Sequence, residues 1–117
     1  MDKCPFCQIV KRELLAQIMY EDDRVIAFAP LHPIASGHIL VAPKAHYEGL
    51  ADIPVELLSG IMAITKSISN DLLSTNGATG INLLHATGRD AQQSVFHFHV
   101  HVVPRYPGDG LDLWFAQ

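Results

Sequence analysis

The sequence predicts an α+β fold in which an antiparallel sheet carries one long and one short helix. Its 117 residues suit a single domain over residues 1–117. Apolar residues make up 49% of the chain and charged residues 17%, a balance that favours a folded core and excludes whole-chain disorder. Strand-like segments with short links surround one long helical segment, and this order favours antiparallel pairing with helices packed on the sheet.

The first part of the chain is expected to form the short helix and a hairpin. Apolar residues recur at helical spacing over residues 5–15 and predict a short amphipathic helix. Residues 18–20 and 24–28 flank the acidic residues 21–23, a pattern that predicts a β-hairpin with the acidic cluster at its turn. Two prolines and a glycine over residues 30–37 then predict a loop.

A buried strand and the long helix are expected next. Residues 38–42 form an apolar run that ends at Pro43, and its length and branched side chains predict a buried strand. Apolar residues at helical spacing over residues 54–75 predict the long helix. We expect Asp52 to cap its N-terminus and Asn76-Gly77 to end it.

Two further strands complete the predicted sheet. Residues 80–84 predict the first, and the polar residues 87–93 predict a loop. Residues 94–103 read S-V-F-H-F-H-V-H-V-V, so histidine and apolar side chains alternate until Pro104 ends the predicted strand.

Composition and charge exclude several classes of partner. The net charge is −4 with the 7 histidines neutral, and protonating all of them would bring it to +3. The sequence has no basic stripe of the kind that binds a phosphate backbone, so a nucleic-acid polymer is not an expected partner. No apolar run approaches the ~20 residues of a membrane helix, and Met1-Asp2-Lys3 does not open an apolar signal. We therefore expect a cytoplasmic protein with no membrane partner.

A row of three histidines is the strongest indication of chemistry. Because side chains alternate along a strand, His97, His99 and His101 should share one face while the apolar residues between them face the core. A polar outer face explains three histidines at period two poorly. They could ligate one catalytic zinc, or one of them could be a nucleophile or base that the others orient. The outer pair would lie ~13 Å apart along the strand, whereas zinc needs each nitrogen at ~2.1 Å, which favours the nucleophile.

The two cysteines of the chain, Cys4 and Cys7, are the second chemical feature. In a reducing compartment, a single C-x-x-C sequence is either a redox pair or half of a metal site. The cysteines alone leave both interpretations open.

Several segments together resemble the histidine triad (HIT) family of nucleotidyl hydrolases and transferases. H-F-H-V-H-V-V at 97–103 resembles the family's His-φ-His-φ-His-φ-φ signature, where φ is an apolar residue, and G-H-I-L-V-A-P-K-A-H at 37–46 resembles its G-H-x-L-V-x-P-K-x-H stretch. C-P-F-C, Y-E-D-D and residues 93–105 extend the resemblance over nearly the whole chain. The resemblance implies a HIT-like fold.

The resemblance also implies a reaction and the residues that carry it. The middle histidine, His99, would attack the α-phosphorus of a nucleotide ester, anhydride or phosphoramidate and form a covalent nucleotidyl-histidine that water hydrolyses. His101 would lie beside the phosphate and leaving group, and His38 would support the triad from the neighbouring strand. Gln93 and Ser94 would donate hydrogen bonds to phosphate oxygens. No metal is needed for that step.

A structural zinc site and a two-fold dimer are implied as well. Cys4, Cys7, His46 and His97 match the zinc-binding branch of the family, and a Cys2His2 set without an open position is typical of structural zinc. An empty or redox-active cysteine pair is the alternative. Trp114 could pack across a dimer interface or cap the domain.

Three positions depart from the family pattern. Pro30 stands where an aspartate normally binds the ribose hydroxyls, Ala86 where an asparagine commonly helps to bind phosphate, and Gln92 where a glycine is usual. Phe28 and Leu31 fall where the family lines its base pocket, although both could equally be core residues. Because these departures alter substrate contacts, a non-catalytic nucleotide-binding or protein-interaction module with a structural zinc is the alternative to a hydrolase.

Overall fold

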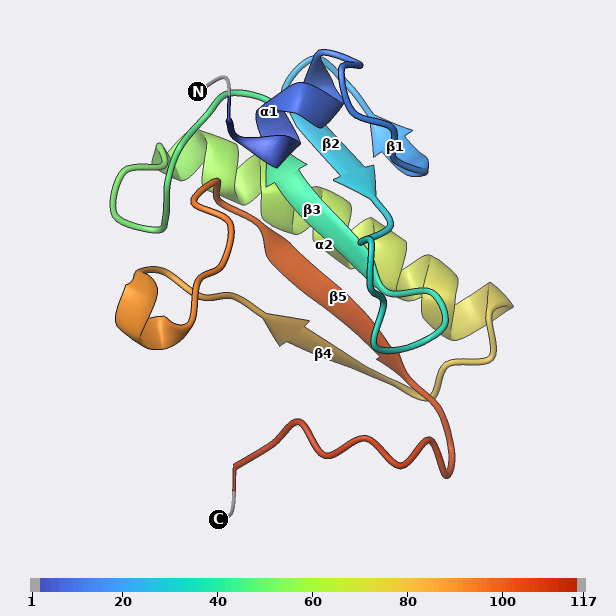
Figure 1. The fold of residues 1–117 in the computed structure, drawn as a ribbon. Coiled ribbons are helices and arrows are strands. Elements are labelled where there is room, and N and C mark those ends of the chain that lie inside the picture. Colours follow the sequence, from blue (N-terminus) through green and yellow to red (C-terminus); the bar gives the residue numbers. More distant parts are fainter. Residues whose placement is uncertain (1–2, 116–117) are drawn as a thin grey trace.

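The computed structural model describes residues 3–115, which are built around one five-stranded sheet. The elements in chain order are α1 (Pro5–Val10), β1 (Ile18–Glu21), β2 (Val25–Phe28), β3 (Ile39–Pro43), α2 (Val55–Thr75), β4 (Gly80–Leu84), the 3-10 helix η1 (Arg89–Ala91) and β5 (Val100–Arg105). Figure 1 shows α2 running behind the sheet and α1 lying against its other face. Within residues 3–115, no helix combines the length and the apolar character needed to cross a bilayer.

The sheet is antiparallel throughout, with the strand order β1-β2-β3-β5-β4. The α+β class with one long and one short helix is therefore confirmed. After β3 the chain passes through α2 to the edge strand β4, and β5 then returns between β3 and β4 (Figure 1). In the β3–β5 pair Leu40 lies opposite His101. The centre of the sheet thus places His38, just before β3, beside His101.

The two faces of the sheet have separate apolar cores. On one face α2 packs over the sheet, and Phe98, Val100 and Val102 are buried in that core. The core on the other face is formed with α1 by Phe6, Ile9, Ile26, Phe28, Leu40 and Ala42. The ring of Phe6 lies against His99, with ring centroids 5.0 Å apart. The intervening histidines therefore lie on the α1 face, in agreement with the alternation along the sequence.

The predicted strand over residues 94–103 is wrong at its start. β5 begins only at Val100, because continuing its register with β3 would pair Phe98 with Pro43, which has no N–H to donate. The N–H of Phe98 instead donates to the carbonyl of Tyr47 at 2.6 Å. Residues 94–99, called the strap below, therefore leave the regular ladder and can turn their side chains independently.

The predicted end of this strand is wrong as well. β5 continues through Pro104 to Arg105, and both residues pair with β4. The last β3 residue paired with β5 is Ile39, opposite Val102, so the proline interrupts no ladder on that side.

Two helix boundaries also differ from the predictions. The helix expected over residues 5–15 stops at Val10, and Arg12 follows with a left-handed φ of 64° that turns the chain toward β1. Asp52 does not cap α2. Its carboxylate accepts the backbone N–H groups of Glu48 and Gly49, so it closes the preceding loop, and α2 starts after Pro54 without a side-chain cap.

Candidate active site and metal centre

The three histidines at 97–101 divide between two neighbouring sites. His99 and His101 lie together, with ring centroids 5.0 Å apart, and both line one pocket. His97 instead turns its Nδ1 toward the Sγ of Cys4, at 3.4 Å. The irregular backbone of the strap makes this division possible, because it directs His97 toward the N-terminal cysteines while His101 stays on β5.

The hydrogen bonds of His99 determine which of its nitrogens can react. Its Nδ1 lies 2.8 Å from the carbonyl oxygen of His97. Because a carbonyl only accepts, Nδ1 carries the proton and Nε2 keeps its lone pair. Burial lowers the pKa of the His99 imidazole below its usual value, so the ring is neutral near pH 7. A neutral imidazole with an available lone pair on Nε2 can act as a nucleophile.

His38 and His101 form a second ordered pair. The backbone N–H of Ile34 donates to Nδ1 of His38 at 3.2 Å, so Nε2 of His38 carries the proton. That proton is donated to Nδ1 of His101, at 2.9 Å, which leaves the N–H of His101 on Nε2. Burial lowers the pKa of His38 and brings that of His101 to about 4, so both rings are neutral. His101 can therefore offer a hydrogen-bond donor beside the lone pair of His99.

The pocket beside these rings has a volume of about 550 Å³, within the range of small-molecule sites. Its walls come from α1 and the segment after it, the end of β2 with the following loop, and the strap. The polar side chains in its lining are Gln17, His32, Ser94, His99 and His101. Among the residues of 3–115 that line it, none is acidic, lysine or arginine. An apolar group can therefore be buried here next to a small polar centre.

Three of the four residues expected to bind substrate, Phe28, Leu31 and Ser94, line this pocket. Phe28 is buried and Ser94 exposed, and both line the pocket together with Pro30. Leu31 also lines it, with 88% of its surface exposed. Phe28 is thus both a core residue and a pocket wall, whereas Leu31 contributes little to the core and lies at the pocket.

Gln93 lies outside this lining. Its Oε1 accepts the N–H of Gly88 at 2.7 Å, and its Nε2 donates to the carbonyls of Glu48 and Val95 at 2.6 and 3.1 Å. Donation to a phosphate would require one of these bonds to open. The neighbouring Gln92 has a left-handed φ of 70°, which gives a physical reason for the glycine usual at this position.

The metal ligands implied by the sequence do converge in space. The donor atoms of Cys4, Cys7, His46 and His97 all lie within 4.8 Å of one another. Sγ of Cys7 lies 3.3 Å from Nδ1 of His46 and 3.6 Å from Nδ1 of His97. Tetrahedral zinc bonded to sulfur at ~2.3 Å and nitrogen at ~2.1 Å separates such donors by about 3.5 Å. The donor set and its spacing therefore fit zinc with no open position.

The electrostatics of the cysteines and the outer contacts of His97 support the same interpretation. Burial and the neighbouring Cys4 raise the pKa of the Cys7 thiol to about 11, so a cation is needed to displace its proton at pH 7. Nε2 of the fully buried His97 donates to the carbonyl of Pro43 at 2.7 Å, which leaves Nδ1 free to bind a metal. In the described chain, His99 and His101 are not members of this cluster, so the geometry opposes a catalytic zinc held by all three histidines.

Three contributors to the site carried no signal in the sequence. Nδ1 of His85 donates to the carbonyl of His99 at 2.9 Å, and its Nε2 accepts the hydroxyl of Thr87 at 2.5 Å. The ring of Phe6 lies edge-on to both His97 and His99. The backbone N–H of Ile34 sets the tautomer of His38. A backbone donor or a ring packed from a distant helix has no sequence spacing by which it could be found.

The fold and these two sites define an α+β protein that places a neutral histidine pair at a pocket beside a Cys2His2 centre. The sequence model of the HIT domain matches residues 11–108. Over 113 residues the chain is 42% identical to an uncharacterized HIT-like protein of Borreliella burgdorferi, which covers 95% of this chain and 81% of that protein. The chain therefore belongs to the HIT domain family.

Two further comparisons concern activity and metal. Adenylylsulfatase HINT3 of Arabidopsis thaliana is 34% identical over 108 residues, which cover 92% of this chain and 55% of that protein. The crystal structure of a Zn-bound histidine triad family protein from Mycobacterium smegmatis matches with a TM-score of 0.89 and 37% identity, over 98% of this chain and 84% of that chain. Both comparisons agree with the assignment of the chain to the HIT domain family.

Proposed function

We propose that the protein hydrolyses a nucleoside phosphoramidate or a (di)nucleoside polyphosphate at its α-phosphate through a covalent nucleotidyl-histidine on His99. The observation that carries this proposal is the hydrogen bond from Nδ1 of His99 to the carbonyl of His97, at 2.8 Å. It leaves the lone pair on Nε2 of a neutral ring that lines the pocket. The family relationship supports the same class of reaction.

The proposed reaction has two displacements at phosphorus. In the first, Nε2 of His99 forms a bond to the α-phosphorus while the bond from phosphorus to the leaving group breaks, and the leaving atom takes the electron pair. A polyphosphate leaves as an oxyanion, whereas an amine leaves with one proton from solvent. In the second, water bonds to phosphorus, the phosphorus–nitrogen bond returns its electron pair to Nε2, and one proton goes to solvent. The product is a nucleoside monophosphate.

The other residues of the site would stabilise charge and bind the substrate. The Nε2–H of His101 would donate to the transferring phosphoryl group, and His38 fixes that N–H by donating to Nδ1 of His101. The hydroxyl of Ser94 would be a further donor, since Ser94 lines the pocket. Phe28 and Leu31 would contact the base. Gln93, expected to bind phosphate, would first have to release one of its bonds to the chain.

Zinc at the Cys2His2 site would have a structural role in this proposal. The four donors leave no position for water or substrate, so when bound the metal supplies a cross-link between the N-terminus, the segment after β3 and the strap. The chain itself then connects the two sites, because His97 contributes Nδ1 to the metal site and its carbonyl to His99.

The experiment is intact-mass spectrometry of protein quenched during turnover of a purine nucleoside phosphoramidate. We expect a nucleotidyl adduct on His99 and no adduct in His99→Ala. Zinc content, melting temperature and nucleotide affinity of the variant serve as controls for its fold. Full activity of His99→Ala would refute the mechanism, and nucleotide binding without adduct or turnover in the unmodified protein would support the non-catalytic alternative.

We also propose a homodimer, as the family resemblance implies, and a cytoplasmic location, as expected from the sequence. Trp114 is 55% exposed and stacks on Phe115 with ring centroids 5.3 Å apart, so an apolar surface is available near the C-terminus. Sedimentation of the protein and of Trp114→Ala measures the oligomeric state, and a monomeric unmodified protein would refute the dimer.

A further inference from the structure

The loop before β3 ends in a tight turn whose last residue is His38. The N–H of His38 donates to the carbonyl of Ala35 at 3.1 Å, and Gly37, the third residue of the turn, has a φ of +89°. These features are typical of a type II turn, which needs glycine at that position. Just before the turn, the N–H of Ile34 donates to Nδ1 of His38. The position of this turn therefore decides whether the His38 ring meets its backbone donor.

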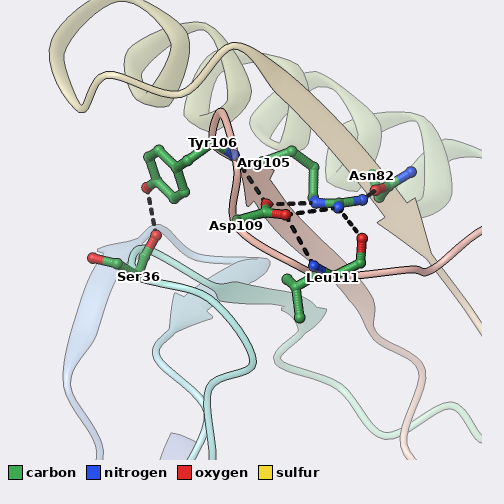
Figure 2. Close-up of polar contacts among 6 residues, drawn as sticks. All are labelled: Ser36, Asn82, Arg105, Tyr106, Asp109 and Leu111. Carbon is green, nitrogen blue, oxygen red and sulfur yellow. Dashed lines mark hydrogen bonds and ion pairs between the residues drawn. The ribbon is translucent and has the colours of Figure 1, made fainter.

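Tyr106 connects this turn to the end of the sheet. It directly follows β5, and Figure 2 shows its ring reaching across to the turn. Its hydroxyl donates to the carbonyl of Ser36 at 2.5 Å and accepts the side-chain N–H of Asn76 at 2.7 Å. Because Asn76 ends α2, one hydroxyl joins the turn, the helix and the strand.

The packing of Gly37 shows independently that the turn is seated against these elements. A Cβ added to Gly37 would lie 3.1 Å from Nδ2 of Asn76, 3.2 Å from Leu72 and 3.3 Å from Pro104. The backbone of the turn thus approaches α2 and β5 closely. The hydrogen bonds of Tyr106 to Ser36 and Asn76 lie beside Gly37, so they hold a turn that already packs closely on α2 and β5.

Tyr106 is itself held by an ordered network (Figure 2). Its backbone N–H donates to the carboxylate of Asp109 at 3.0 Å. Arg105 donates to both oxygens of that carboxylate, at 2.9 and 3.0 Å, and also to Oδ1 of Asn82 and the carbonyl of Leu111. These bonds restrain the chain after β5, so the backbone of Tyr106 is held in place while its hydroxyl binds the turn.

We propose that Tyr106 is a positioning residue for the His38–His101 pair. By binding the carbonyl of Ser36, it keeps the turn where the N–H of Ile34 meets Nδ1 of His38. The proton of His38 then stays on Nε2, and His101 keeps its own proton on Nε2, facing the substrate. The effect on turnover rests on the proposed function, whereas the effect on the tautomers of the two rings does not.

The test removes the hydroxyl and keeps the ring. Tyr106→Phe retains the part of the side chain that packs on the α2 core. Tyr20→Phe is the matched control, because Tyr20 also packs on that core and its hydroxyl donates at 2.6 Å to Asp22, at the other edge of the sheet. Histidine ring nitrogens are observed by long-range proton–nitrogen NMR of each zinc-loaded protein, and kcat and KM are measured on a nucleoside phosphoramidate.

We expect the unmodified protein and Tyr20→Phe to show His38 and His101 protonated only on Nε2. In Tyr106→Phe the signals of these two rings should average between tautomers, while His99 keeps its proton on Nδ1. The value of kcat should fall about fivefold, as for the loss of one hydrogen bond, with little change in KM. A Tyr106→Phe protein that matches Tyr20→Phe in spectra and kcat overturns the inference.

The two readouts separate this inference from the proposed function. Altered tautomers in Tyr106→Phe, in a protein that turns over no nucleotide, would support the positioning role and refute the hydrolase. Turnover that depends on His99 but is unchanged in Tyr106→Phe would support the hydrolase and overturn the positioning role. If Tyr106→Phe does not fold, Asn76→Ala takes its place, with a smaller change of the same rings expected and unchanged spectra overturning the inference.

Discussion

Discrimination between ribose and deoxyribose is expected to be weak in this protein. The pocket has no acidic side chain among the described residues that line it, and Pro30 forms part of its wall. A hydrogen bond to a charged acceptor contributes about 1.5–3 kcal/mol, which corresponds to roughly 10- to 150-fold in kcat/KM. Because no such acceptor is present, removing the 2′-hydroxyl of a nucleoside phosphoramidate should change kcat/KM by less than about threefold.

The assay compares kcat/KM for ribonucleoside and 2′-deoxynucleoside phosphoramidates in three proteins. Pro30→Asp places a carboxylate at the pocket wall and should raise the preference for ribose to about tenfold or more. Pro30→Ala is the matched control, since it removes the ring without adding an acceptor, and should behave like the unmodified protein. A ribose preference above about tenfold in the unmodified protein would refute the reasoning, because the lining offers no charged acceptor to produce it.

Three other perturbations test the metal site, a supporting hydrogen bond and the C-terminal network. Cys7→Ala, or chelation of the metal, should lower the melting temperature before it lowers turnover per folded molecule, whereas immediate loss of turnover at unchanged stability would contradict a structural zinc. His85→Phe keeps a ring against Phe98 but loses the bond to the carbonyl of His99, so it should lose about 1 kcal/mol of unfolding free energy in urea titrations and several-fold in kcat. The Arg105 guanidinium and backbone N–H donors hold the pKa of Asp109 below its usual value, so its contribution is complete above about pH 4 and is lost as pH falls. The stability difference between the protein and Asp109→Asn should therefore shrink between pH 7 and pH 3, and a constant difference would contradict this.

His97 explains why the Cys2His2 cluster and His99 lie so close together. Its Nδ1 belongs to the Cys2His2 cluster, its Nε2 donates to Pro43, and its carbonyl receives the N–H of His99. Fixing the ring of His97 on a metal therefore also fixes the carbonyl that selects the tautomer of His99. Loss of metal is expected to act on catalysis through this backbone group rather than through Lewis-acid chemistry at the substrate.

Much of the fold could be predicted because periodicity reports burial directly. The long helix, the hairpin and the buried strand before Pro43 follow from apolar spacing, and their existence agrees with the structure. Among the boundaries that were wrong, the start of β5 depends on a partner far away in the chain, whereas the missing cap of α2 depends on neighbouring loop residues. β5 starts late because Pro43 cannot pair with Phe98, and Asp52 is used by a loop rather than by α2.

The sequence by itself determined which chemistry is available: three imidazoles at period two on one face, and two thiols spaced as a redox pair or as half of a metal site. Only the tertiary structure decided what each imidazole can do. A neutral histidine is a donor on one nitrogen and an acceptor on the other, and the backbone group that the fold places beside the ring chooses between them. For His97 that group is the carbonyl of Pro43, and for His38 it is the N–H of Ile34. The contact with Pro43 joins segments far apart in the chain, and the contact with Ile34 depends on how the turn before β3 is placed, so the histidine spacing alone encodes neither choice.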